Sequence, residues 1–309
     1  MERASETALG SDLPLAAVRR AVGAALAEDL GWGDVTSDAL VPPELLASAI
    51  MVARQAGIVA GLPVAREAFL SVDTSLTVEF RAHDADRVQH GDELLRVHGR
   101  ARSILAAERV ALNFVQRLSG TATLTARFVE AVAGTSTRIV DTRKTTPGLR
   151  VLEKYAVRCG GGHNHRFHLG DAVLLKDNHR EALAAAGATM AEAVREARRM
   201  LGPAVTIEIE VDTPAELEHA LAAEPDAILL DNMGPTELGV CVARIRAIPR
   251  RITIEASGGV NLDTVRSVAA AGVDLISVGA LTHSAPAFDA ALDFHVAGRA
   301  AVGAAPESR

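Results

Sequence analysis

Short apolar segments rich in β-branched residues recur along the second half of the chain, separated by alanine-rich stretches with helical spacing. The apolar segments are 137–142, 172–176, 205–211, 227–231, 252–257 and 275–279. The helical stretches are 181–201, 214–223, 235–247 and 262–271. This regular alternation is typical of βαβ units and predicts a parallel sheet.

The distribution of polar residues within these segments favours a barrel over an open, doubly wound sheet. Apolar and polar residues alternate along 205–211, where Glu208 and Glu210 share one face, and again along 252–257. Alternate side chains of a strand point to opposite faces, and a parallel sheet covered by helices on both sides is apolar on both faces. One apolar and one charged face therefore indicates helices on the outside only and a lined interior.

The first third of the chain has a different pattern. Residues 48–100 contain short alternating runs broken by Gly, His and Asp, without helix-length gaps, which predicts a small, mainly antiparallel sheet. Residues 103–132 predict a helix that is interrupted at Ser119-Gly120. We expect helices and a sheet-rich domain over 1–115, an α/β barrel over 116–284, and a C-terminal segment 285–309 whose helix 285–298 packs back before a tail.

Charge and composition exclude several functional classes. The net charge of −7 argues against general nucleic-acid binding, which needs a basic face. Cys159 and Cys241 are far apart and have no metal-ligand spacing, so each is expected to be a buried, reduced residue. The first residues carry acids and lack the apolar core of a signal peptide, and no long apolar run predicts a membrane span. A soluble, cytoplasmic protein is the expectation.

Positive charge is concentrated in one segment, 141–179. All three lysines of the chain, Lys144, Lys154 and Lys176, lie in this segment, together with four histidines and a Gly-Gly-Gly run. A run of charges is usually a solvated surface loop, but a cation at the end of a buried-type strand and a triple glycine disfavour that interpretation. If Arg143, Lys144, Arg166 and Lys176 share a pocket, they could bind two carboxylates, or a carboxylate and a phosphate.

Carboxylates and glycines follow other predicted strands at the same end of the barrel. Glu208, Glu210, Asp231 and Glu255 either form an ion-pair network with Lys144 and Lys176, or hold Mg²⁺ and ribose hydroxyls. Two strand-to-helix turns, Ser257-Gly258-Gly259 and Val278-Gly279-Ala280, expose backbone N–H groups suited to a phosphate.

Nine motifs together resemble the quinolinate phosphoribosyltransferase family, over residues 28–284. They are EDLGWGDVTS, ERVALNFVQRLSGTAT, DTRKTTPGLR, KYAVRCGGGHNHR, LLKDNH, IEIEVDT, ILLDNM, IEASGGV and ISVGALTHS. The resemblance implies an α/β fold: an incomplete barrel of about seven strands with an N-terminal open-faced α+β sandwich domain. It also implies a homodimer in which the sandwich domain of one subunit covers the barrel mouth of the other.

The resemblance further implies a reaction of quinolinate with 5-phosphoribosyl 1-diphosphate, giving nicotinate mononucleotide, diphosphate and CO₂ in NAD biosynthesis. The implied quinolinate-binding residues are Arg143, His165, Arg166 and Lys176, with Arg109 contributed by the partner subunit. The implied phosphoribosyl diphosphate-binding residues are Lys144, Glu210, Asp231, Ser257, Gly258, Gly259, Gly279 and Ala280. Mg²⁺ would be held at Glu210 and Asp231, largely through substrate and water, and the implied catalytic residues are Lys144, Lys176, Glu210 and Asp231.

Three alternatives stay open at this point. A transferase of the same fold could act on another pyridine or pyrimidine-like base, although that base would need fewer cations. A barrel lyase could use Lys176 to form a Schiff base, and a binding protein for a phosphorylated metabolite would show no turnover. The sequence leaves open which of Lys144 and Lys176 assists decarboxylation, the binding order, and whether dimers assemble into hexamers.

Overall fold

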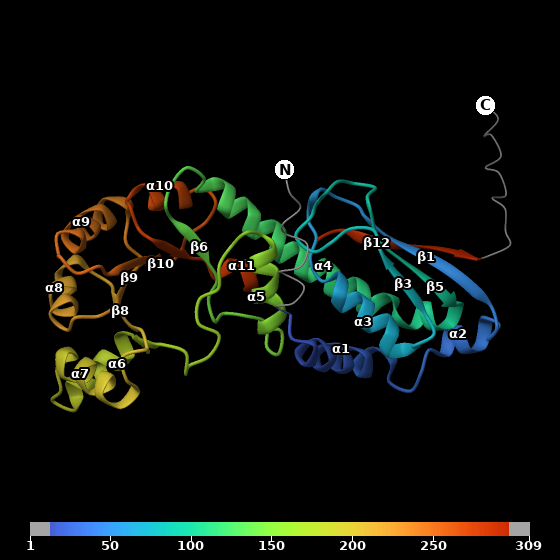
Figure 1. Ribbon diagram of the computed structural model, residues 1–309, viewed down its shortest axis with the longest axis horizontal. Coiled ribbons are helices and arrows are strands. Elements are labelled where there is room, and N and C mark those ends of the chain that lie inside the picture. The colour runs from blue at the N-terminus through green and yellow to red at the C-terminus, as the bar shows by residue number, and fades with distance from the viewer. Residues whose placement is uncertain (1–12, 297–309) are drawn as a thin grey trace. The chain divides into compact units, whose positions relative to one another are not determined.

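The structure, a computed structural model, describes residues 13–296 and divides into two units (Figure 1). One unit contains the chain up to Thr123 together with the segment that starts at Pro286, and the other contains Leu124–Ala285. A single helix, α4 (Ala101–Ala131), contributes to both units. The division therefore falls inside a helix, a few residues after the position at which the sequence predicts the barrel domain to begin.

The N-terminal unit is built on an antiparallel sheet with the strand order β12-β1-β5-β3. Its strands are β1 (Leu46–Ala53), β3 (Thr77–Phe80), β5 (Glu93–Arg100) and β12 (Ala290–Val296), beside a small pair formed by β2 (Gly57–Ile58) and β4 (Arg87–Val88). Its helices are α1 (Leu15–Leu30), α2 (Val35–Leu40) and α3 (Leu62–Val72). The antiparallel sheet agrees with the sequence prediction, whereas α3 was not predicted. Leu62, Ala65 and Phe69 recur at helical spacing and are fully buried, which gives α3 an apolar face.

The prediction of a helix over 285–298 is wrong for the part that the structure describes. Residues Ala290–Val296 form strand β12, which pairs antiparallel with β1 from Ala53↔Ala290 to Ala47↔Val296. The Ala- and Leu-rich composition favours a helix, but the open edge of β1 offers backbone hydrogen bonds along the whole segment. Tertiary pairing of this kind outweighs a weak local propensity.

The predicted interruption of the long helix at Ser119-Gly120 is also wrong, because α4 is continuous through both residues. Gly120 is required for packing rather than for a break. A Cβ atom at this position would lie 2.1 Å from the carbonyl oxygen of Pro286. Glycine thus lets the chain that leads into β12 pass directly against the helix.

The second unit is a curved parallel sheet whose outer side is covered by helices (Figure 1). The strand order is β6-β11-β10-β9-β8-β7, for β6 (Arg138–Val140), β7 (Val173–Leu175), β8 (Ile207–Val211), β9 (Ala227–Asp231), β10 (Thr253–Ser257) and β11 (Leu275–Ser277). The helices are α5 (Arg150–Cys159), α6 (Asp177–Ala185), α7 (Met190–Leu201), α8 (Pro214–Ala222), α9 (Pro235–Arg246), α10 (Val265–Ala270) and α11 (Ala280–His283). The α/β architecture is confirmed. The sheet has six strands where about seven were expected, and within residues 13–296 no strand pairing closes β6 onto β7.

Side-chain alternation divides the sheet as the sequence predicts. Ile207, Ile209 and Val211 of β8 lie in the hydrophobic core with the neighbouring strands and helices. Glu208 and Glu210 alternate with them and therefore face the other way. The helices thus bury the apolar face, and the concave face is left for polar residues.

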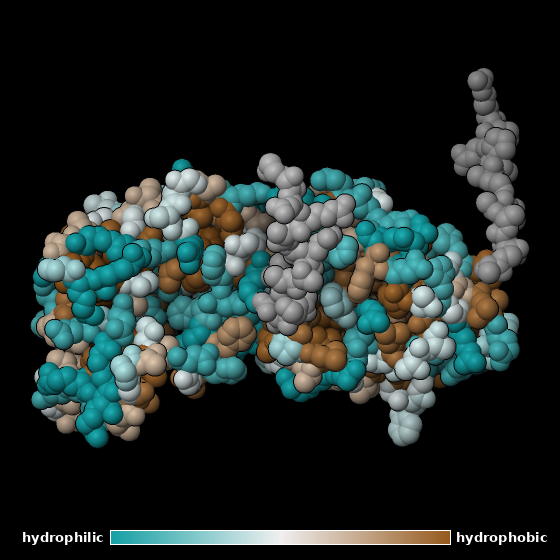
Figure 2. Space-filling view, in the orientation of Figure 1, coloured by the Kyte–Doolittle hydropathy of each residue, from teal (hydrophilic) through white to brown (hydrophobic). Residues whose placement is uncertain are grey.

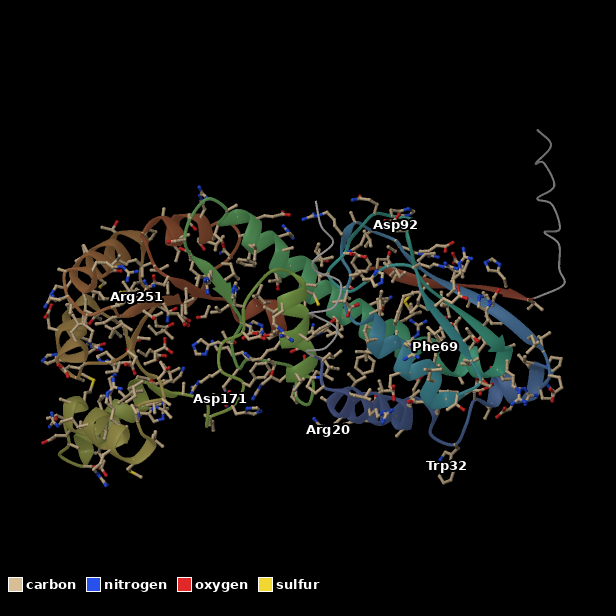
Figure 3. The ribbon with its side chains drawn as sticks, viewed as in Figure 1. Arg20, Trp32, Phe69, Asp92, Asp171 and Arg251 are labelled. Atoms are coloured by element: carbon tan, nitrogen blue, oxygen red, sulfur yellow. The ribbon has the colours of Figure 1, made fainter. Side chains whose placement is uncertain are left out.

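The face of the molecule in Figure 2 carries both hydrophilic and hydrophobic residues. Within residues 13–296 no helix is long and apolar enough to cross a membrane. Several large apolar side chains of the N-terminal unit are nevertheless exposed. Trp32 projects freely from the turn between α1 and α2, and Val35 and Leu40 of α2 are also exposed (Figure 3).

Candidate active site

The carboxyl ends of the parallel strands surround a cavity of about 330 Å³. Its lining includes eight residues that the sequence predicts for the site: Arg143, Lys144, His165, Arg166, Lys176, Glu210, Asp231 and Ser257. Thr142, Glu255 and Ser277 complete the polar part of the lining. Active sites of α/β barrels lie at this end because strand-terminal side chains and the following loops converge there.

A larger hollow of about 720 Å³ lies near the amino ends of β6, β10 and β11. Its wall carries several arginines and Asp274, which is already paired with Arg246 at 2.8 Å. Arg246 also donates to the carbonyl oxygen of Ile252. These contacts connect the amino ends of the strands to α9, so the charged residues of the larger hollow have a structural role. We therefore assign the chemistry to the smaller cavity.

Two arginines of the smaller cavity have no carboxylate partner within residues 13–296. Arg166 donates one N–H to the carbonyl oxygen of Ala172 at 3.0 Å, which fixes its guanidinium plane. The Nε atom of Arg143 is buried without a hydrogen-bond partner among the described residues. Burial lowers the pKa of Arg166, and the nearby charge of Arg143 lowers it further. Two uncompensated guanidinium groups in one cavity favour an anionic ligand, because an unpaired buried donor is costly.

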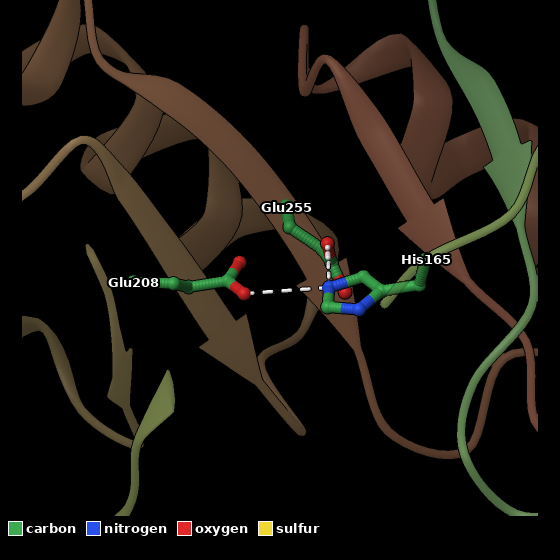
Figure 4. Close-up of side chains that lie close together, drawn as sticks. All are labelled: His165, Glu208 and Glu255. Carbon is green, nitrogen blue, oxygen red and sulfur yellow. Dashed lines mark ion pairs between the residues drawn. The ribbon is translucent and has the colours of Figure 1, made fainter. Parts of the chain in front are cut away.

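His165 lies between two buried glutamates (Figure 4). Its Nε2 atom is 3.3 Å from Glu208 Oε2 and 3.3 Å from Glu255 Oε2. Burial alone would lower the pKa of His165, but the two carboxylates outweigh it and raise the pKa to about 10. One contact opposes them, since the backbone N–H of Arg166 points at Nδ1 at 2.8 Å. Two charged partners against one amide dipole favour the imidazolium form of His165 at neutral pH.

The glutamate pairings differ from the expected network. Glu208 and Glu255 contact His165 rather than Lys144 or Lys176, and only Glu210 pairs with Lys176, at 3.2 Å. Burial and the neighbouring Glu255 raise the pKa of Glu208. The sequence showed that these carboxylates share the barrel interior, but not which cation each one meets.

A second group of carboxylates could hold a divalent cation. Glu210, Asp212 and Asp231 each offer an oxygen atom within 4.8 Å of the others. Burial raises the pKa of Glu210, Lys176 opposes this shift, and Asp231 adds to it. Crowded carboxylate oxygens at a cavity edge are the ligands that Mg²⁺ prefers, so these residues fit such an ion. Asp212 was not among the predicted ligands.

The two glycine turns lie beside this cavity. Gly258 has φ +88°, and a Cβ atom there would lie 2.2 Å from Asn232 Oδ1. Gly258 and Gly259 border a hollow of about 320 Å³ that shares Ser257 with the main cavity. At the second turn, a Cβ on Gly279, which precedes Ala280, would lie 3.3 Å from Lys144 Cδ. Gly258 is therefore required by the backbone, whereas a Cβ on Gly279 would only press on the flexible side chains of His283 and Lys144.

Beneath the cavity lies a buried ion pair that sequence reasoning missed. Lys154 of α5 and Asp141, which follows β6, are both fully buried and in contact. Asn164 donates to Asp141 Oδ2 at 2.6 Å. Burial raises the pKa of Asp141 and lowers that of Lys154, while their mutual contact opposes both shifts. The one available signal was that Lys154 belongs to the segment that holds all the lysines.

Arg109 is the predicted site residue that belongs to the other unit. It lies on the α4 helix in the part of the chain before Thr123, where its side chain is exposed.

Comparison with known proteins gives consistent matches over both units. Residues 34–119 match the profile of the quinolinate phosphoribosyl transferase N-terminal domain, and residues 121–293 match that of the C-terminal domain. The nicotinate-nucleotide pyrophosphorylase [carboxylating] of Mycobacterium leprae is 44% identical over 289 residues, covering 92% of this chain and 99% of that protein. A probable enzyme of the same name from Bacillus subtilis is 42% identical over 86% of this chain and 89% of its own length. The solved nicotinate-nucleotide pyrophosphorylase of Francisella tularensis superposes with a TM-score of 0.85 at 36% identity, covering 91% of this chain and 97% of that one.

Proposed function

This chain belongs to the quinolinate phosphoribosyltransferase family, and we propose that it joins quinolinate to the phosphoribosyl group of 5-phosphoribosyl 1-diphosphate. The products are nicotinate mononucleotide, diphosphate and CO₂, in a step of NAD biosynthesis. The observation that carries the proposal is the cavity in which Arg143 and Arg166 have no carboxylate partner among the described residues, opposite a cluster of acids.

The cationic side of the cavity suits quinolinate, which carries two adjacent carboxylates. Removing both from water without partners would cost many kcal/mol, so the pocket must compensate them. Arg143, Arg166 and the His165 imidazolium supply that compensation, with Lys176 at the border of the acidic side. The guanidinium groups also fix the plane of the ring, which aims its nitrogen atom at the ribose.

The opposite side suits the phosphoribosyl diphosphate. Lys144 and the turns at Ser257-Gly258-Gly259 and Gly279-Ala280 provide positive charge and backbone N–H groups for phosphates. Glu210 and Asp231 would hold Mg²⁺ through water and substrate, and the ion would neutralise charge that develops on the leaving diphosphate.

The reaction order follows from the chemistry of the ring. The ring nitrogen attacks C1 of the ribose, and the C1–O bond breaks with its electron pair going to diphosphate. The resulting pyridinium accepts electrons, so the carboxyl group beside the nitrogen leaves as CO₂. The ring carbon that carried this group keeps the electron pair and then takes up a proton. Lys144 and Lys176 both line the cavity, and either ammonium can stabilise the transient carbanion.

We also propose that the active enzyme is a homodimer with shared sites, in which Arg109 serves the cavity of the partner subunit. The exposed Trp32, Val35 and Leu40 support an interface on the N-terminal unit, since large apolar groups are costly to leave in water. The complementation experiment in the Discussion tests the arrangement.

One assay tests the reaction itself. We expect the protein to release labelled CO₂ from carboxyl-labelled quinolinate only when 5-phosphoribosyl 1-diphosphate and Mg²⁺ are both present. Turnover of nicotinate instead would identify a transferase for another base. Trapping of a carbonyl substrate by borohydride at Lys176 would identify a lyase instead.

A further inference from the structure

Helix α5 presents three charged residues, Arg150, Glu153 and Lys154, on one face, at positions i, i+3 and i+4. Lys154 and Glu153 are fully buried, although burial of either type is rare without a partner. We call these three residues the α5 clamp. None of them lines the cavity described above, so the proposed chemistry gives them no role.

Lys154 holds the segment that carries the base-binding histidine and arginine. Its Nζ donates to the carbonyl oxygen of His165 at 2.9 Å and lies 4.9 Å from the centre of the Phe167 ring. Asp141, the ion-pair partner of Lys154, accepts the backbone N–H of His165 at 2.9 Å. The ion pair thus fixes both backbone polar groups of His165.

Glu153 and Arg150 hold the neighbouring segment, which carries Arg143. Glu153 accepts the backbone N–H of Thr146 at 3.0 Å and its hydroxyl at 2.7 Å. Arg150 joins the two segments, because it donates to the carbonyl oxygens of Phe167 at 2.9 Å and Arg143 at 3.3 Å.

The acidic side of the cavity is supported differently. Lys176, Glu210 and Asp231 stand at or next to the ends of β7, β8 and β9. The backbone of Lys144 is held through its carbonyl oxygen by the Thr282 hydroxyl at 2.7 Å. No hydrogen bond or ion pair joins the side chains of the α5 clamp to these four residues within 13–296, although Arg150 binds the neighbours of Lys144, Arg143 and Thr145.

We infer that the α5 clamp positions Arg143, His165 and Arg166 for the base, whereas Lys176, Glu210 and Asp231 on the phosphoribosyl diphosphate side are placed by their strand ends. The clamp residues are positioning residues, because they act through the backbone of the two segments and not on substrate. This inference rests on the proposed function, since it assigns the three positioned residues to quinolinate.

The test separates KM for quinolinate from KM for 5-phosphoribosyl 1-diphosphate in four variants. Arg150→Gln removes two carbonyl contacts and the hydrogen bond to Thr145 Oγ1 from a half-buried position and is expected to fold. Lys154→Met leaves Asp141 buried without its cation, so it is paired with the neutral double variant Asp141→Asn/Lys154→Met. Leu152→Ala is the control, because it creates a cavity in the same helix at an apolar side chain that makes no hydrogen bond to either segment.

We expect KM for quinolinate to rise roughly tenfold to a hundredfold in both Lys154 variants and less in Arg150→Gln, with KM for the diphosphate substrate unchanged within about twofold. The neutral double variant should regain thermal stability without regaining quinolinate affinity. The carbonyl oxygen of His165 still lacks the hydrogen bond that the Lys154 ammonium donates. Leu152→Ala should lower Tm and leave both KM values in place.

Three results would overturn the inference: an unchanged quinolinate KM in Arg150→Gln, recovery of that KM together with Tm in the double variant, or an equal rise in Leu152→Ala. If Lys154→Met does not fold, Arg150→Gln and the double variant still test the positioning role of the α5 clamp. Failure of the wild-type protein to use quinolinate would reject the proposed function instead, before any variant is compared.

Discussion

Arg143 and Arg166 illustrate how an unsatisfied group can point to a ligand. In residues 13–296 neither forms an ion pair, although each lies in a cavity that also contains carboxylates. Two buried glutamates of the same sheet face, Glu208 and Glu255, pair with His165 instead. The free guanidinium groups are therefore available for the carboxylates of a substrate.

The geometry of Arg166 predicts that replacing it by lysine impairs the enzyme although the charge is kept. A planar guanidinium can donate two parallel hydrogen bonds to a carboxylate, which an ammonium cannot do. The loss of about 1.5–3 kcal/mol, roughly tenfold to over a hundredfold, should appear in kcat/KM for quinolinate. Arg199→Lys, on the exposed face of α7, is the control and should behave as wild type. A normal kcat/KM in Arg166→Lys would remove Arg166 from the base pocket.

His165 is predicted to remain protonated far above the usual range for histidine. Its pKa of about 10, against 6.5 for the unperturbed group, means that its contribution to stability is complete below pH 6.5. That contribution decreases as pH rises from about 6.5 and is lost near 10. Nitrogen-15 NMR of the ring should show both nitrogens protonated at pH 7, and Glu208→Gln should move the titration toward neutral pH. A neutral ring at pH 7 would show that the Arg166 N–H contact at Nδ1 prevails.

At the scale of elements, the barrel strands were predictable because each is a short apolar run with β-branched residues, and most are separated by helical stretches. The predicted segment 227–231 coincides with β9, and 205–211 differs from β8 only at its start. The failures arose where a distant segment decides the conformation. Residues 290–296 become a strand because β1 offers its edge, and α4 passes through Gly120 because the chain at Pro286 packs there.

In the candidate site, too, the sequence predicted positions on strands but not the contacts made with distant segments. Strand-end positions were enough to predict that Lys176, Glu210 and Asp231 share one cavity, because parallel strands end at one edge of a sheet. The partners of Glu208, Glu255 and Lys154 depend on loops, whose course the local sequence does not determine. The ion pair of Lys154 with Asp141 was therefore not predictable, although both residues stand in a recognised motif.

The turn after β10 is predicted to depend on glycine. Gly258→Ala would force an alanine to adopt the left-handed backbone conformation at φ +88° and would press its Cβ atom against Asn232. The resulting strain is about 1–3 kcal/mol. We expect a lower Tm and a higher KM for 5-phosphoribosyl 1-diphosphate, with a smaller effect on quinolinate. Gly239→Ala in α9 is the matched control, because no atom lies within 4 Å of its Cβ position and alanine favours a helix by about 1 kcal/mol. An unchanged KM for the diphosphate substrate would place the phosphate elsewhere.

At the scale of the whole molecule, the three arginines assigned to quinolinate come from both units, Arg109 from before Thr123 and Arg143 and Arg166 from after it. If each cavity takes Arg109 from the partner, Arg109→Ala and Arg143→Ala should each be nearly inactive but complement each other when refolded together. A mixed two-fold dimer then has one site with both changes and one with neither. Random assortment makes about half of the dimers mixed, so roughly a quarter of wild-type activity should return.

Mass spectrometry should confirm that mixed dimers form, because only then is a negative result informative. If Arg109 serves its own chain, every site carries one of the two changes and mixing restores nothing. That outcome would reject the shared site and would leave the family membership of the chain untouched.

The pairing of β12 with β1 also sets an order of events during synthesis. A ribosome makes β1 early and β12 only after every strand of the parallel sheet has been completed. Throughout that interval the edge of β1 from Ala47 to Ala53 lacks its partner, and an open strand edge can pair with another chain. The barrel strands can therefore assemble before the N-terminal sheet is finished, and the last described strand acts as the closing step. Nascent chains that stop before Ala290 should accordingly be the form of this protein most prone to aggregate.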